Sequence, residues 1–350
     1  MSYSAQIDSV DQGQWSRLLR DFDDATIFQT WAYGSARWGP DNLSHAVIEK
    51  DGEVVALAQA VLVGVPILGR VLALVAFGPV WLKRGAPRSI EHVQGALRAL
   101  RQEYEERRRL CLRLRFWAYE FSDQVDAAVL AEGSWRQAES APKTYILDLS
   151  RSESELRSAM DKKWRANLRK AEQGALTVSQ HDDREGIRIF AELHQEMRDR
   201  KHFPSDFVDA LPALYEDLPE DFKPNIFVCW RGNQPVASAI VSAMGDRAFY
   251  LNGANGDAAL EVRGGYFLQW AIVRWLKENK PCRWYDLNGI MTTPGVRQFK
   301  RGLVGANPPE IILKEIEACD DVLAAFVVGS GSRLHERFRN LKLHFKRLTR

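Results

Sequence analysis

The stretch Trp284–Gly302, WYDLNGIMTTPGVRQFKRG, combines the clearest structural and chemical signals in the chain. Its apolar start predicts a short buried strand that ends in the polar residues Asp286 and Asn288. We expect a loop to follow and to deliver the cations Lys300 and Arg301, because α/β folds place binding groups in the loops after strands. Two cations between small residues suit a phosphate or a developing oxyanion. A solvated basic loop is the alternative.

Length and composition indicate a globular protein of two domains. The chain has 350 residues, of which 45% are hydrophobic and 27% charged, and the net charge is only +2. The longest apolar runs, Val54–Val65 and Val71–Val80, are broken or ended by glycine and proline, short of the ~20 residues that a membrane helix needs. No basic segment followed by an apolar one opens the chain. We therefore predict a cytoplasmic protein.

The cysteines and histidines give no sign of a metal centre. Cys111, Cys229, Cys282 and Cys319 lie far apart and form no C-x-x-C pair. Three of them lie in apolar runs, where a buried free thiol is the usual state, so we expect free thiols and no disulfide framework. The seven histidines form no H-E-x-x-H arrangement, and we predict that no metal or other cofactor is held.

A similar order of strands and helices occurs on each side of residue 150. On the N-terminal side, strands expected at Val54–Val63 and Arg70–Phe77 follow a hairpin turn at Asp51-Gly52. On the C-terminal side, a capping box at Ser152–Glu155 opens a striped helix that runs to Gly174, and three strands form a meander over residues 226–252. We predict an α/β (α+β) fold of two similar domains, residues 1–150 and 151–318, each a mixed sheet flanked by helices.

Three further constellations suggest anion binding, each with an ordinary structural alternative. Arg263 precedes two glycines and Tyr266 at a helix start, where open N–H groups favour an anion; a simple turn is the alternative. Arg165 and Arg169 lie on a basic helix face that suits a phosphate-bearing ligand or RNA; a solvated face is the alternative. Arg37 lies among core-forming aromatic residues and is expected to reach a cleft between the domains.

Residues 319–350 are expected to form a separate C-terminal tail. After the glycine-serine run 329–332, apolar residues recur at helical spacing, while seven Lys or Arg residues face a single acid. This pattern predicts a basic amphipathic helix. Residues 333–350 are expected either to lie on an anionic membrane surface, at its cytoplasmic side, or to pack on the second domain.

Taken together, these segments resemble the Fem-type (FemABX) peptidyl and aminoacyl transferases, a family of two GNAT-like domains in tandem. The likeness runs from about Phe28 to Ile316, and it lies in the order and spacing of several segments rather than in one motif. The segments that carry it are Phe28–Gly34, Gly78–Val80, Lys163–Ala171, Tyr285–Gly289 and Val296–Lys300.

The resemblance implies a substrate class and roles for particular residues. In that family an aminoacyl-tRNA donates an amino acid to an amine of a peptidoglycan precursor that carries a diphosphate on a nucleotide or a lipid. By resemblance, Lys300 neutralises the donor or its tetrahedral intermediate. We further expect Arg301 to help stabilise the oxyanion and Asp286 to orient Lys300 or the amine. The resemblance places Arg37, Arg165 and Arg169 in one diphosphate site, and Tyr266 and Phe299 in an acyl pocket.

The chain also departs from the family pattern. Phe116–Glu120 replaces a segment that commonly has an acidic residue followed by proline, so no general base is assigned there. The same fold is reused by proteins of exopolysaccharide assembly. Two alternatives therefore stay open: a CoA-dependent GNAT N-acyltransferase acting on a sugar or exopolysaccharide precursor, and a non-catalytic polysaccharide-assembly protein that binds a glycan-lipid.

Overall fold

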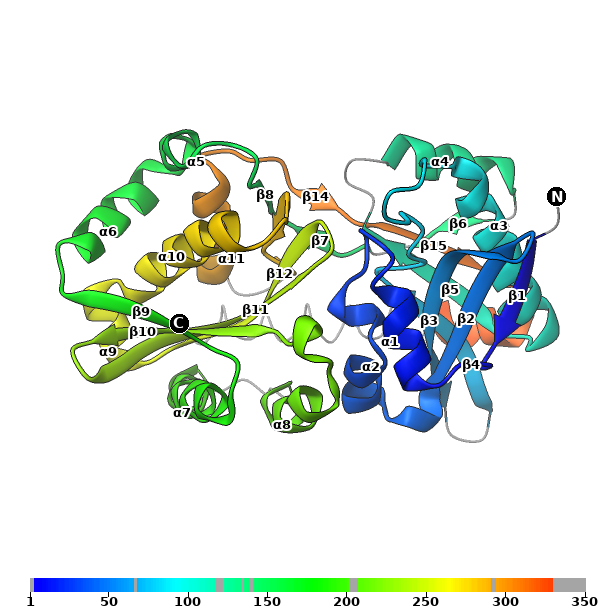
Figure 1. The fold of residues 1–350 in the computed structure, drawn as a ribbon, viewed down its shortest axis with the longest axis horizontal. Coiled ribbons are helices and arrows are strands. Elements are labelled where there is room, and N and C mark those ends of the chain that lie inside the picture. The colour runs from blue at the N-terminus through cyan, green and yellow to red at the C-terminus, as the bar shows by residue number, and fades with distance from the viewer. Residues whose placement is uncertain are drawn as a thin grey trace.

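The computed structural model describes residues 3–65, 68–117, 122–133, 135–138, 141–201, 207–290 and 294–329. Two large sheets, each flanked by helices, lie next to each other along the long axis (Figure 1). This confirms the predicted α/β architecture. No helix within these ranges is long and apolar enough to cross a membrane. The predicted amphipathic helix over residues 333–350 lies outside the described residues.

The first sheet is built mainly from the N-terminal part of the chain. Its strand order is β1-β2-β3-β4-β5-β15-β6, and all neighbours are antiparallel except β4 and β5. The Asp51-Gly52 hairpin between β2 and β3 is confirmed, with both residues at positive φ. The strands are β1 Tyr3–Ile7, β2 Leu43–Lys50, β3 Glu53–Val65, β4 Gly69–Ala76, β5 Cys111–Phe116, β15 Lys314–Ala318 and β6 Arg136–Gln137.

Alternation along these strands gives the first sheet two buried faces. Ala46 and Ile48 of β2 pack with α3 (Ile90–Leu100) and α4 (Ser122–Ala131), whereas Val47 packs with the other pair of helices. The second pair is α1 (Gln12–Leu19) and α2 (Trp31–Trp38). These two helices cover the face of the first sheet that borders the cleft between the two domains.

The second sheet has the strand order β8-β13-β12-β11-β10-β9, and the predicted meander forms its centre. One face packs against α6 (Lys162–Glu172) and α10, and the other against α7 and α8. The strands are β8 Ile146–Asp148, β13 Trp284–Asp286, β12 Arg247–Asn255, β11 Gln234–Met244, β10 Asn225–Arg231 and β9 Leu176–His181. The helices are α7 Arg184–Lys201, α8 Phe207–Asp217 and α10 Gly264–Asn279, with α9 Asp257–Val262 before α10.

The single helix expected from Ser152 to Gly174 is two helices, α5 (Glu153–Ala159) and α6 (Lys162–Glu172). The capping box of Ser152 and Glu155 is confirmed. Asp161 interrupts the helix because its side chain accepts hydrogen bonds from the N–H groups of Lys163 and Trp164 and so caps a new one. The apolar stripe continues across the break, since its residues stay buried in one core cluster.

The sheets do not divide at residues 150 and 318 as the sequence suggested. β8 precedes residue 150 but pairs with β13 in the second sheet, and β15 returns to the first sheet between β5 and β6. Each sheet thus contains a strand from beyond the expected boundary. Hydrophobic periodicity predicts a strand but not its partner, which explains why the sequence did not indicate this exchange.

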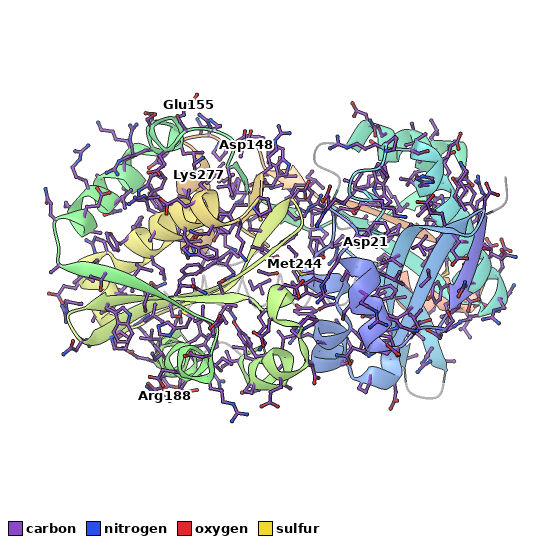
Figure 2. The ribbon with its side chains drawn as sticks, viewed as in Figure 1. Asp21, Asp148, Glu155, Arg188, Met244 and Lys277 are labelled. Atoms are coloured by element: carbon purple, nitrogen blue, oxygen red, sulfur yellow. A yellow bond between two sulfur atoms is a disulfide. The ribbon has the colours of Figure 1, made fainter. Side chains whose placement is uncertain are left out.

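Aromatic side chains join the two domains. Phe77 and Trp117 of the first domain and Phe249 and Trp284 of the second form one buried cluster. Arg247, only 2% exposed, crosses this contact: its guanidinium lies 4.1 Å from the Trp117 ring centroid and donates to the Trp117 carbonyl at 3.3 Å. Figure 2 shows side chains filling the space between the two ribbons. The cleft therefore has a closed, packed base.

Cys111 and Cys319 form a disulfide, so the expectation of free thiols is wrong for this pair. The antiparallel register places Ala318 opposite Leu112 and thereby brings Cys319 next to Cys111, although 208 residues separate them. Sequence spacing gives no sign of such a long-range pairing. Cys229 and Cys282 are buried free thiols, as predicted.

Reducing this disulfide is expected to lower the free energy of unfolding by about 2–4 kcal/mol, because the closed loop restricts the unfolded chain. Urea denaturation of the wild type with and without a reductant measures the change. The Cys111→Ser/Cys319→Ser variant is the control, and its midpoint should not respond to the reductant. Equal midpoints for oxidised and reduced wild type would contradict the prediction.

Candidate active site

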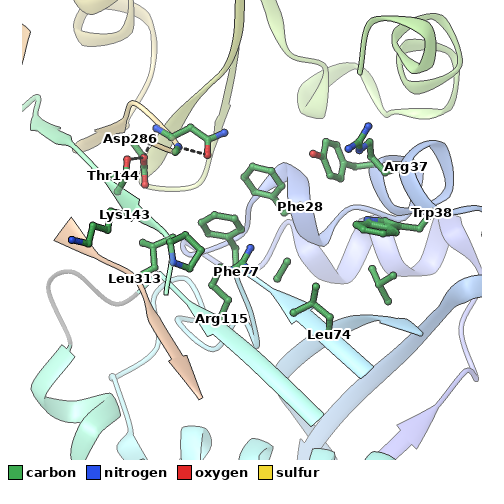
Figure 3. A pocket seen from close by; sticks show the side chains of 16 residues that line it. Phe28, Arg37, Trp38, Leu74, Phe77, Arg115, Lys143, Thr144, Asp286 and Leu313 are labelled. Carbon is green, nitrogen blue, oxygen red and sulfur yellow. Dashed lines mark hydrogen bonds between the residues drawn. The ribbon is translucent and has the colours of Figure 1, made fainter. Parts of the chain in front are cut away.

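A cleft between the two sheets holds a cavity of about 300 Å³ lined by both domains. Asp286 and Lys143 lie at one end, Phe28 and Phe77 in the middle, and Arg37 with Trp38 at the other end (Figure 3). The remaining lining residues are Tyr33, Val61, Leu74, Ala76, Arg115, Pro142, Thr144, Asn288, Gly289 and Leu313. The cavity is thus polar at both ends and aromatic between them.

Asp286 ends β13 at the inner end of the cleft and is only 1% exposed. Its carboxylate accepts hydrogen bonds from Trp117 Nε1 at 2.7 Å, from the Asn288 N–H at 2.6 Å and from Thr144 Oγ1. Burial raises the pKa of this carboxyl above its ordinary value, against the effect of the three donors and of nearby Lys300. The donors come from three separate segments, so Asp286 is held in one orientation.

Lys300 lies on a helix, α11 (Pro294–Val304), and not on the loop predicted from the sequence. Proline at the first helical position is favourable because its missing N–H has no partner there. The Lys300 side chain is 7% exposed, and its ammonium donates to the carbonyls of Asn288 at 3.1 Å and Gly289 at 3.0 Å. Lys300 thus lies against the turn that lines the cleft and holds it in place.

Burial lowers the pKa of Lys300 to about 8, although the negative charge of Asp286 opposes the shift. The Tyr250 ring lies 5.5 Å from the ammonium and contributes to its burial. Near neutral pH the group is therefore a desolvated cation with little competing water. Such a cation interacts more strongly with a nearby developing negative charge than an exposed lysine does.

Three aromatic rings pack together next to Lys300. Tyr266 of α10 lies 5.0 Å from Phe299 of α11 and 5.1 Å from Trp164 of α6, measured between ring centroids. Trp164 Nε1 is buried and has no hydrogen-bond partner among the described residues. The structure therefore brings Tyr266 and Phe299 together, with Trp164 as a third member that the sequence indicated only as a core residue.

The predicted cationic residues do not all lie in the cleft. Arg37 lines the cleft, but Arg165 and Arg169 lie on α6, which packs against α10 and α11. The structure therefore does not place Arg165 and Arg169 with Arg37 among the residues that line this cavity, and a shared diphosphate site stays a prediction. Arg165 donates to the Ser158 carbonyl, Arg263 to the Leu260 carbonyl within its own turn, and Arg169 and Arg301 are exposed.

Two other cations of the cleft, Arg115 and Lys143, were not predicted from the sequence. Arg115 pairs with Glu315 at 2.6 Å and Lys143 with Glu310 at 3.3 Å. Among the cations found to line the cavity, Arg37 is the one for which the described residues supply no ion pair. The available signal for Arg115 was its place in the apolar run that forms β5, one residue before the end of that strand. No group of three or more potential metal ligands occurs among the described residues.

Comparison with known proteins supports this architecture. Residues 157–301 match the acetyltransferase (GNAT) domain family. A comparison with curated protein sequences finds no significant match. The crystal structure of FemX aligns with 92% of this chain and 99% of its own, with a TM-score of 0.73 at 13% identity.

Two further structures share the fold over nearly the whole chain. The C-terminal domain of a putative lysylphosphatidylglycerol synthetase from Agrobacterium fabrum covers 93% of this chain and 98% of its own, with a TM-score of 0.57 at 11% identity. L-PGS from Bacillus licheniformis covers 93% and 97%, with a TM-score of 0.55 at 13% identity. The chain therefore has two GNAT-like domains in tandem. Its fold is Fem-like and similar to that of FemX, and its second domain contains the segment that matches the acetyltransferase (GNAT) domain family.

Proposed function

We propose that the protein is an acyltransferase that moves an aminoacyl group from aminoacyl-tRNA to an amine of a peptidoglycan precursor. The observation that carries this proposal is the buried Asp286 at the inner end of a cleft that both domains build, with the buried Lys300 bonded to the carbonyls of Asn288 and Gly289, which line that cleft. Acyl transfer develops negative charge on a carbonyl oxygen, and a fixed, desolvated cation stabilises that charge.

The transfer is direct, within a complex of both substrates. The acceptor nitrogen attacks the ester carbonyl, the new C–N bond forms, the C–O bond to the ribose breaks, and the amine proton leaves with the departing oxygen or to water. The free thiols of Cys229 and Cys282 are poor nucleophiles, because burial raises the pKa of each to about 12. A covalent acyl-enzyme on either thiol is therefore not expected.

The two substrates approach Lys300 from different sides. We assign the donor side to the aromatic group of Trp164, Tyr266 and Phe299, because Phe299 directly precedes Lys300 on α11, in the domain that matches the GNAT family. The exposed cations of α6, including Arg169, suit the phosphates of an RNA donor. The names of the lysylphosphatidylglycerol synthetase structures support an aminoacyl group as the one transferred.

We assign the acceptor to the cleft, where Arg37, a cation with no ion pair among the described residues, faces the precursor diphosphate. Replacing Arg37 with methionine is expected to raise the acceptor KM by about 10- to 150-fold, because a charge-assisted bond to an anion contributes about 1.5–3 kcal/mol. Steady-state kinetics with varied acceptor measure this effect. Arg169→Met on α6 is the matched control and should leave the acceptor KM unchanged; an equal rise in both variants would contradict the assignment.

The rate of transfer is expected to fall as pH rises through about 8, where Lys300 loses its proton. Because its pKa is lowered, Lys300 of the wild type loses its positive charge at a lower pH than an exposed lysine does. Lys300→Arg retains its charge at higher pH, so its descending limb should move upward even if its maximum rate is lower. Descending limbs at the same pH in both proteins would contradict this assignment.

A CoA-dependent N-acyltransferase is the second candidate, and the start of α10 favours it. Gly264 and Gly265 open this helix after Arg263, and the region lies within the segment that matches the GNAT domain family. Incubating the protein and a peptidoglycan precursor with either charged tRNA or acetyl-CoA, followed by mass spectrometry, separates the candidates. Added aminoacyl mass only with tRNA supports the first proposal, and added acetyl mass only with acetyl-CoA replaces it.

A further inference from the structure

Arg247 is a buried cation in the contact between the two domains, and the proposed mechanism gives it no role. It begins β12, and the parallel pairing of β12 with β13 places it opposite Trp284, two residues before Asp286. Its side chain is almost completely buried. Taking a guanidinium out of water is costly unless its partners compensate for the lost hydration. Those partners therefore show what Arg247 is fixed against.

Carboxylates from both domains hold the Arg247 guanidinium. Within the second domain, its Nε donates to Asp246 at 2.7 Å. In the first domain, burial raises the pKa of Asp24 to about 6 and the charge of Arg247 opposes this rise, so Asp24 is largely ionised near neutral pH. Asp24 is itself fixed, because it accepts from the N–H groups of Trp81 at 2.9 Å and Leu82 at 3.0 Å. The guanidinium is thus anchored before any contact with Trp117 is considered.

The same guanidinium fixes Trp117 through both its ring and its backbone. The central carbon of the guanidinium lies 4.1 Å from the ring centroid, and Nη1 donates to the Trp117 carbonyl at 3.3 Å. The indole Nε1 of Trp117 donates to the Asp286 carboxylate at 2.7 Å. A hydrogen bond of this length does not survive a displacement of about 1 Å. The position of the indole therefore decides whether Asp286 keeps this donor.

We propose that Arg247 is a positioning residue of the acyl-transfer site. It holds the Trp117 indole at the place where its N–H orients the Asp286 carboxylate. Asp286 in turn accepts from the N–H of Asn288, whose carbonyl accepts from the Lys300 ammonium. Neither Arg247 nor Trp117 is among the described residues that line the cavity, so the effect reaches the substrates through Asp286. The expected effect on the rate rests on the proposed function, whereas the contact itself does not.

A double-mutant cycle on kcat tests this role. Arg247→Lys keeps the positive charge but loses the planar face and the forked donors of the guanidinium. We expect it to lower kcat at least ~10-fold in the wild type, because the site loses its geometry. In the Trp117→Phe background it should lower kcat less than about 2-fold, since phenylalanine has no N–H to position. A purely structural role of Arg247 predicts the same factor in both backgrounds.

Arg283→Lys is the matched control for this cycle. Arg283 lies 4.7 Å from the ring centroid of Trp284, so it also stacks a guanidinium on an indole, but its side chain is 50% exposed. We expect kcat of this variant to equal that of the wild type. An equal loss in Arg283→Lys and Arg247→Lys would show a general effect of the domain contact and would overturn the inference.

A spectroscopic measurement tests the contact without any reaction. The full-length protein is labelled with 5-fluorotryptophan, and the Trp117 resonance in the ¹⁹F NMR spectrum is identified as the one that Trp117→Phe lacks. Arg247→Lys should shift or broaden this resonance and leave that of Trp15, in a separate core cluster, unchanged. Asp246→Ala, which removes the acceptor of Arg247 Nε, should act in the same direction and replaces Arg247→Lys if circular dichroism shows that variant to be unfolded.

The two measurements separate this inference from the proposed function. A Trp117 resonance that stays in place in the folded variant, or equal kcat factors in the two backgrounds, would overturn the role of Arg247. A wild type that transfers neither an aminoacyl nor an acetyl group would overturn the proposed function alone, because the Trp117 resonance still decides whether Arg247 fixes the indole.

Discussion

Lys300→Met is expected to lower kcat for acyl transfer by at least ~100-fold, because it removes the cation placed to stabilise the tetrahedral oxyanion. The effect should fall on kcat more than on either KM, since a charge that develops only in the transition state contributes little to binding the ground state. Rapid-quench measurement with both substrates at saturation tests this directly.

The fold of this variant should survive. Two hydrogen bonds to the carbonyls of Asn288 and Gly289 are lost, but a desolvated ammonium is removed as well, and the two effects oppose each other. Thermal unfolding serves as the control, and Lys280→Met, at a partly exposed lysine after α10, is the matched variant. Full activity of folded Lys300→Met would remove Lys300 from the mechanism.

Asp286→Ala is expected to lower the free energy of unfolding by about 3–5 kcal/mol, the usual cost of breaking a buried charged network. Three buried donors lose their acceptor: Trp117 Nε1, Thr144 Oγ1 and the Asn288 N–H. The charge opposite Lys300 also disappears, so the pKa of Lys300 should fall further. Urea denaturation measures the stability, and the pH–rate profile should show its descending limb at a lower pH.

Trp117→Phe separates the effect of one donor from that of the whole network. It keeps an aromatic ring in the contact between the domains but removes the bond to Asp286, so a loss of only about 1–3 kcal/mol is expected. An Asp286→Ala variant no less stable than Trp117→Phe would show that the carboxylate does not organise this part of the cleft.

The sequence was sufficient where the signals were local. The Asp51-Gly52 turn, the capping box at Ser152 and the strands of the second-domain meander follow from neighbouring residues. The sequence did not predict the helix α11, because Pro294, Gly295 and Gly302 are residue types that usually interrupt a helix. Gly302 is required by packing instead: a Cβ there would lie 3.0 Å from Trp164 Cδ1, so glycine allows α11 to approach α6 closely.

The candidate site was predicted in its second-domain half and, in the first domain, only at Arg37. Asp286, Phe299 and Lys300 lie within one stretch, and Tyr266 could be added by resemblance. The partners of Asp286 could not be predicted, because Trp117 and Thr144 come from distant segments that meet only when the sheets form. The disulfide and the strand exchange have the same cause, since both depend on long-range pairing.

The position of β15 in the first sheet has a consequence for how the protein is made on the ribosome. About 200 residues separate β5 from β15, which at typical synthesis rates is a delay of roughly 10 to 40 seconds. During that time β5 is an open edge strand, the kind that pairs with other chains. The first domain, although synthesised first, is completed last, so nascent chains that stall before residue 314 should be prone to aggregation.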